Sequence, residues 1–144
     1  MRSLVLVLDQ LDQLAVELVA ATNAAIVDVG AGDLSFSQWR MLMVLGSSGG
    51  SLRIHEIAER VSASMPSASR LVGRMERRGL VTSARDPIDL RGRRVALTAD
   101  GEALRLRVVR RRRAMIEERL GDLPHDPNFV ASLEAVVTRM ARWL

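Results

Sequence analysis

Apolar residues recur at helical spacing over the first part of the chain, from Leu4 to about Val29. They lie three or four positions apart on one face: Leu4, Leu8, Leu11, Ala15 and Leu18. Others widen this apolar surface: Val5, Leu6, Val7, Leu14, Val16 and Val19. A chain of 144 residues has too small a core to bury such a helix completely, so part of its surface is expected to contact a second copy. The pattern therefore predicts a long helix and a homodimer.

The C-terminal part of the chain predicts two more helices. Thr98 is suited to cap a helix from Ala99 to about Leu120, and Asp126 with Pro127 begins the last helix. An unbroken apolar stripe follows: Phe129, Leu133, Val136, Val137, Met140 and Leu144. This last helix is therefore amphipathic.

The segment after the first helix predicts a second helix and a short strand. Ser35 and Gln38 form a capping box, with Leu34 and Trp39 placed as a hydrophobic staple. We interpret Trp39 as a core residue rather than a ligand platform, because the staple already gives its indole a packing role. Ser51–Arg53 is suited to a third small strand of a sheet.

Two shorter helices are predicted next, separated by a break at residues 62–64. Their apolar stripes are Ile54, Ile57, Ala58 and Val61, then Ala68, Leu71, Val72 and Met75. Ser64 is suited to cap the second helix, Pro66 lies in its first turn, and Gly79 ends it. This spacing is that of a helix-turn-helix.

A basic hairpin follows the helix-turn-helix. Residues 80–84 and 94–98 favour strands, and the turn-rich loop between them contains Arg85, Arg91 and Arg93. A helix-turn-helix with such a hairpin is a winged helix. The predicted fold class is therefore mainly α, with a small β component.

The positive charge is concentrated in this winged helix. From Arg53 to Arg94 there are ten arginines and five acidic residues, a net charge of +5, whereas the rest of the chain has a net charge of −1. All 21 basic side chains are arginine. Such a distribution is typical of a surface that binds phosphate.

The second helix of the motif has a polar face opposite its apolar stripe. Ser67, Arg70 and Arg74 share this face, as the residues of a recognition helix do in the DNA major groove. Either arginine is suited to bind guanine O6 and N7 or to clamp phosphate. Ser64 and Ser69 are candidate short hydrogen-bond donors to phosphate. Met65 and Pro66 are candidate apolar contacts for thymine methyl groups.

The composition argues against several other functions. The chain has no cysteine, which excludes disulfides and thiolate metal sites, and its two histidines are far apart in the sequence, so we expect no metal and no cofactor. Asp9 and Asp12 interrupt the apolar N-terminal run too early for a signal peptide or membrane span, which predicts a cytoplasmic protein. The sequence contains no phosphate-binding loop and no nucleophile–base motif, so it gives no indication of an enzyme.

The order of these segments resembles the MarR family of bacterial transcription regulators. The resemblance runs from about Leu34 to Gly101 and rests on the segments IAERV, SASRLV, RMERRGLV, DPIDLRG and LTADG. It implies one domain, residues 1–144, in which residues 33–102 bind DNA and residues 1–32 with 103–144 form the dimerisation region. It also implies a repressor that binds a pseudo-palindromic operator and is released by a small anionic or aromatic ligand.

The resemblance also implies roles for the wing. In this family the arginine of an Asp-x-Arg pattern enters the minor groove, and the matching residues here are Asp89 and Arg91. Leu90 replaces the basic residue usual between them, and Arg93 and Arg94 are candidates to compensate. Family ligands bind between the dimerisation and DNA-binding parts, where the candidate residues are Trp39, Arg40 and Met43.

Three points stay open from the sequence. Arg110–Arg113 is interpreted as a solvated face that pairs with Asp9, Asp12 or Glu17 rather than as a flanking contact to DNA, because the run lies several helical turns from the wing. The chain is alternatively a DNA-binding protein without a ligand. A winged helix that binds protein is the third alternative, and the arginines of the recognition face argue against it.

Overall fold

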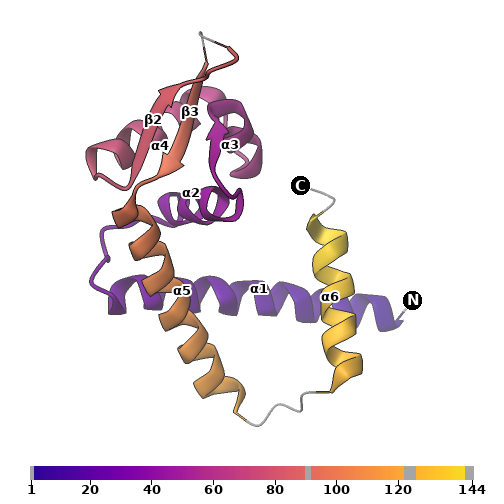
Figure 1. The fold of residues 1–144 in the computed structure, drawn as a ribbon. Coiled ribbons are helices and arrows are strands. Elements are labelled where there is room, and N and C mark those ends of the chain that lie inside the picture. Colours follow the sequence, from indigo (N-terminus) through magenta and orange to yellow (C-terminus); the bar gives the residue numbers. More distant parts are fainter. Residues whose placement is uncertain (1, 90–91, 122–125, 142–144) are drawn as a thin grey trace.

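The computed structural model describes residues 2–89, 92–121 and 126–141 and confirms the predicted fold class. In this part of the chain, six helices accompany one sheet of three strands (Figure 1). The elements are α1 (Arg2–Asp28), α2 (Phe36–Ser47), β1 (Ser51–Arg53), α3 (Ile54–Arg60), α4 (Met65–Arg77), β2 (Val81–Arg85), β3 (Arg93–Leu97), α5 (Ala99–Leu120) and α6 (Pro127–Ala141).

The helix ends follow the predicted caps. The Ser35 Oγ accepts from the Gln38 N–H at 3.3 Å, and the Gln38 Oε1 accepts from the Ser35 N–H at 2.8 Å, which confirms the capping box of α2. Ser64 caps α4, and Gly79 follows that helix with φ of 69°. Thr98 caps α5. These boundaries therefore agree with the local sequence pattern.

The sheet is antiparallel, with β3 between β1 and β2. The predicted third strand is confirmed, since Ser51 pairs with Ala96 and Arg53 with Arg94. The two wing strands each lie one residue away from the predicted positions. Leu80 lies in the turn that ends α4, because its N–H donates to the Met75 carbonyl at 3.1 Å.

The core lies inside the winged helix and continues to the adjoining ends of α1 and α5. Leu34 and Trp39 are buried, as the staple predicts. Figure 1 shows α1 as a long rod below the winged helix, with α5 running down from the base of the sheet and away from the wing.

The N-terminal half of α1 and the whole of α6 lie outside this core. Within the described residues, α6 makes no extensive packing contact with another element. The apolar side chains of both helices are exposed, including Leu4, Leu6, Leu8, Val16, Phe129, Leu133, Val137 and Met140. This is the surface for which the sequence predicts a partner chain.

Candidate nucleic-acid interface

The recognition face predicted for α4 is exposed. Ala68, Leu71, Val72 and Met75 face the core, whereas Ser69, Arg70 and Arg74 are exposed and Ser67 is half-buried. The Ser64 Oγ accepts from the Ser67 N–H at 3.4 Å, which satisfies a backbone donor in the first turn. The apolar stripe therefore turns the two arginines of α4 outward.

The first turn of α4 has polar contacts of its own. The Ser67 Oγ lies 3.0 Å from the Ser64 Oγ and accepts from Arg70 Nη2 at 3.2 Å. These bonds hold the Arg70 side chain along the helix without neutralising its charge. Met65 and Pro66 are exposed at the same end of the helix.

Several arginines near α4 form no ion pair within 4.0 Å in the part of the chain that the structure describes. They are Arg40, Arg60, Arg70, Arg74, Arg77 and Arg85. Arg40 donates instead to the Arg60 carbonyl at 3.2 Å. Arg40 and Arg74 also line one hollow of about 130 Å³ between α2 and α4, together with Ser37 and Ser67. Positive charge that no close ion pair neutralises therefore gathers around the recognition helix.

Other arginines of the winged helix are occupied within the molecule. Arg78 pairs with Asp33 at 3.0 Å. Arg93 pairs with Glu76 at 3.3 Å and also contacts Ser83. The structure thus places Arg93, a sequence candidate for DNA, in an exposed ion pair on the wing.

Arg94 is the second candidate to replace the basic residue that is usual at position 90, and it makes more contacts within the molecule than Arg93 does. Its Nε donates to the Ser51 Oγ at 2.8 Å and its Nη2 to the Ser51 carbonyl at 2.6 Å. Its Nη1 also lies 3.6 Å from Asp86. These contacts give Arg94 a structural role in the sheet, and a contact of Arg93 or Arg94 with DNA stays a prediction.

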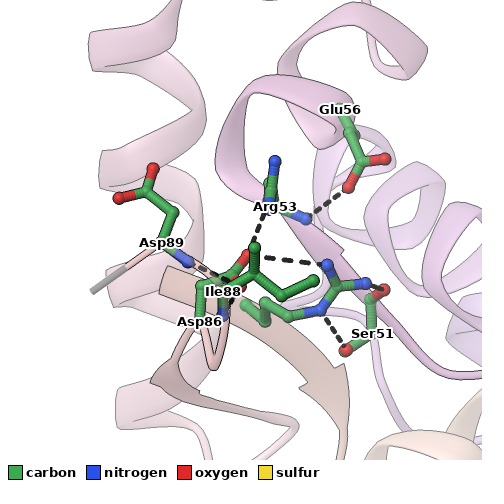
Figure 2. Close-up of polar contacts among 7 residues, drawn as sticks. Ser51, Arg53, Glu56, Asp86, Ile88 and Asp89 are labelled. Carbon is green, nitrogen blue, oxygen red and sulfur yellow. Dashed lines mark hydrogen bonds and ion pairs between the residues drawn. The ribbon is translucent and has the colours of Figure 1, made fainter. Parts of the chain in front are cut away.

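The wing begins at Asp86, which the sequence analysis did not single out. Its side chain is fully buried and accepts from Arg53 Nε at 2.5 Å (Figure 2). The Arg53 guanidinium holds the pKa of Asp86 well below its usual range. The Asp–Pro pair marks a turn, but no sequence pattern pairs Asp86 with a residue 33 positions away. Asp89 is exposed on the same loop, and Leu90 and Arg91 lie outside the described residues.

The three candidate ligand residues of α2 lie in different surroundings. Trp39 is buried, which confirms its interpretation as a core residue. Arg40 lines the hollow beside α4, while Met43 is half-buried against the core. A common ligand site for these three residues stays a prediction.

An arginine of α5, Arg112, approaches the ring of Trp39. The Arg112 guanidinium lies 5.9 Å from the centre of the Trp39 ring, and its Nη1 donates to the Thr22 Oγ1 at 3.3 Å. Its Nε is buried and has no hydrogen-bond partner among the described residues. Burial, and then the neighbouring Arg113, lower the pKa of Arg112.

The predicted pairing of the arginine run with α1 is partly correct. Arg111 pairs with Asp28 at 2.8 Å, so the acidic partner is not Asp9, Asp12 or Glu17. The difference arises because α5 packs against the C-terminal end of α1, whereas those three acids lie at least 11 residues before Asp28 along the helix. Arg112 is also half-buried rather than part of a solvated face.

The described residues form neither a metal site nor a membrane-spanning helix. Across residues 2–89, 92–121 and 126–141, no group of three or more histidine, cysteine, aspartate or glutamate side chains is placed to hold a metal ion. None of the described helices is both long enough and apolar enough to cross a membrane.

Comparison with known proteins agrees with this geometry. Residues 32–92 match the model of the MarR family. The chain is 34% identical over 97 residues to the homoprotocatechuate degradative operon repressor of Escherichia coli, a match that covers 65% of this chain and 65% of that protein. The matched segment thus spans slightly under two thirds of the relative.

Solved structures share the fold over nearly the whole chain. RV1404 from Mycobacterium tuberculosis has a TM-score of 0.84 at 22% identity, covering 96% of this chain and 95% of that one. A MarR family protein from Bacillus stearothermophilus has a TM-score of 0.79 at 20% identity, covering 98% and 94%. NadR in complex with 4-hydroxyphenylacetate has a TM-score of 0.70 at 24% identity, covering 92% and 89%.

Proposed function

We propose that this chain is a member of the MarR family and a homodimeric transcriptional regulator that binds a specific DNA sequence. The observation that carries the proposal is the exposed face of α4, where Arg70 and Arg74 have no acidic partner among the described residues. A helix of this width fits the major groove, and its arginines are suited to guanine edges or phosphate.

The wing supplies the second contact in this proposal. Asp89 and Arg91 match the Asp-x-Arg pattern of the family, so we infer that Arg91 enters the minor groove beside the major-groove site. A narrow A·T-rich groove has an enhanced negative potential that favours a guanidinium. The operator is therefore expected to have A·T-rich flanks outside the bases that α4 contacts.

Dimerisation is assigned to the helices outside the winged helix. Residues 1–32 and 103–144 would form the dimerisation region, with residues 33–102 binding DNA. The exposed apolar side chains of α1 and α6 support this assignment, because a single protomer does not bury them. A two-fold dimer predicts an inverted repeat with half-sites about 10 base pairs apart.

Selection from a random duplex library tests the function. We expect enrichment of an inverted repeat by the unaltered chain. Arg70→Ala should relax the preference at the central bases of each half-site, and Arg91→Ala should weaken it at the A·T-rich flanks. Arg107→Ala, an exposed arginine of α5, is the control and should select the same repeat. Failure of the unaltered chain to enrich any sequence would contradict the proposal.

We also propose that a small molecule releases the protein from DNA. The E. coli relative is named as the repressor of a degradative operon, and NadR is in complex with 4-hydroxyphenylacetate, an aromatic acid. We infer that this chain is a repressor released by a related anionic aromatic compound, with Trp39, Arg40 and Met43 as candidate contacts. Titration of 4-hydroxyphenylacetate into the DNA complex should weaken binding, with acetate as control. No effect across a series of aromatic acids favours the ligand-independent alternative.

A protein-binding winged helix is the competing function. Binding to DNA phosphates weakens steeply as salt rises, because counterions are released. The face of α4 is charged rather than apolar, which favours DNA. A protein partner whose binding is insensitive to salt would favour the competing function.

A further inference from the structure

Asp86 is a buried carboxylate at the base of the wing. Its side chain has no exposed surface, although the neighbouring residues Arg85, Pro87 and Ile88 are all exposed. Ile88 is 86% exposed. A buried carboxylate persists only where cations and hydrogen bonds satisfy it. The turn at Asp86 and Pro87 does not by itself explain why this carboxylate is buried, so the groups that contact it need to be considered.

Two arginines from two different strands reach the same carboxylate oxygen. Arg53 ends β1, and its Nε donates to the Asp86 Oδ2 at 2.5 Å. Arg94 lies in β3 directly opposite Arg53, with its Nη1 3.6 Å from that oxygen. Asp86 itself follows the last residue of β2. One carboxylate thus connects all three strands of the sheet (Figure 2).

The other oxygen of Asp86 holds the backbone of the wing. The Oδ1 accepts from the Ile88 N–H at 2.8 Å and from the Asp89 N–H at 3.2 Å (Figure 2). The Asp86 N–H in turn donates to the Gly92 carbonyl at 3.0 Å. A Cβ at residue 92 would lie 3.2 Å from the Asp89 carbonyl oxygen, so glycine allows the two sides of the loop to approach closely. These bonds set the direction in which the wing leaves the sheet.

The same pairing determines which arginines remain available to DNA. Arg53 lines a hollow with His55, Met65 and Arg93, between α3, the start of α4 and the wing. Without Asp86, the charge of Arg53 would add to the phosphate-binding surface, whereas Ser51 would still hold Arg94. Sequence-independent affinity increases with each cation that contacts phosphate. Asp86 therefore limits attraction to any duplex while it holds the wing.

We propose that Asp86 is a positioning residue that determines specificity: it holds the wing for the minor groove and withholds Arg53 from phosphates. The proposal rests on the function proposed above. It predicts an unusual outcome, since removing one negative charge should weaken binding to the operator and strengthen binding to unrelated DNA. A residue with only a structural role would weaken both.

The test compares Asp86→Asn with the unaltered chain on the selected operator and on a scrambled duplex of equal length. Asparagine keeps an acceptor for the Ile88 and Asp89 N–H groups but no longer pairs with either arginine. We expect the ratio of the two affinities to fall about tenfold or more, the scale of one lost base-specific contact. On scrambled DNA, the slope of log affinity against log salt should steepen by about one, as one more phosphate is neutralised.

Two further variants separate charge from position. Glu102→Gln, which breaks the ion pair with Arg105 in the first turn of α5, changes the net charge equally and should keep the affinity ratio. Adding Arg53→Gln to Asp86→Asn removes one released cation, so the salt slope should return toward that of the unaltered chain without recovery of the ratio. Proportional loss of both affinities, or an unchanged ratio in Asp86→Asn, would overturn the proposal. An unaltered chain without any duplex preference would instead overturn the proposed function itself.

Discussion

The guanidinium of Arg112 lies 5.9 Å from the centre of the Trp39 ring, and this contact joins α5 to the core of the winged helix. Arg112 also donates to Thr22 of α1. Three helices therefore meet at one partly buried cation that has no acidic partner among the described residues. Helices α1 and α5 are thus joined to the core of the winged helix at this point.

Replacement of Arg112 should show how little its charge contributes to stability. A cation over an indole contributes about 0.5–2 kcal/mol, but its desolvation and the unsatisfied Nε oppose this gain. We expect Arg112→Met to change the free energy of unfolding by less than about 1 kcal/mol, because the apolar side chain retains the packing on Trp39. Arg112→Ala should destabilise the chain more. Urea unfolding of both variants measures the difference. A loss of unfolding free energy in Arg112→Met that exceeds about 1 kcal/mol would contradict this account.

Acid should destabilise the fold partly through Asp86. Its pKa is lowered first by the Arg53 guanidinium and then by the Ile88 N–H. A carboxylate with a lowered pKa in the folded state stabilises the fold above its unfolded pKa of about 4, and that contribution is lost as the pH falls further. The melting temperature should therefore drop below about pH 5, and less steeply in Asp86→Asn. Parallel melting curves against pH for the two proteins would refute this role.

Gly101 should not tolerate a side chain. A Cβ there would overlap the carbonyl oxygen of Leu80, where the wing meets the first turn of α5. That oxygen also accepts from the Thr98 N–H at 3.1 Å, so it is not free to move. We expect Gly101→Ala to cost about 1–3 kcal/mol of unfolding free energy. Thermal unfolding of each variant measures this cost. Gly50→Ala, with no atom within 4 Å of the added Cβ, is the matched control and should leave the unfolding free energy nearly unchanged.

The dimer should depend on the apolar face of α6. Leu133→Glu places a charge among exposed apolar side chains that a partner would cover, so we expect monomers and a loss of operator binding. Thr138→Glu introduces the same charge at a polar position of the helix and should leave the dimer intact. Light scattering coupled to size-exclusion chromatography measures the mass of each. A dimeric Leu133→Glu protein would place the interface elsewhere.

The sequence predicts those parts of the structure that depend on local pattern. The cap at Ser64, the capping box at Ser35 and the exposed arginines of α4 all follow from residues within two turns of one another. The Arg53–Asp86 pair does not, because its partners meet only when β1 joins the sheet. Nor did the sequence predict that Arg111 pairs with Asp28, since the place where α5 crosses α1 depends on tertiary packing.

The most direct test of the whole account is the affinity of the unaltered chain for its selected duplex against a scrambled duplex at physiological salt. Competition measured by fluorescence anisotropy gives both values from the same preparation. We predict a preference of about a thousandfold or more, with much of it lost in Arg70→Ala. Equal affinities for the two duplexes would show that the arginines of α4 attract phosphate without reading sequence, and would contradict the proposed function.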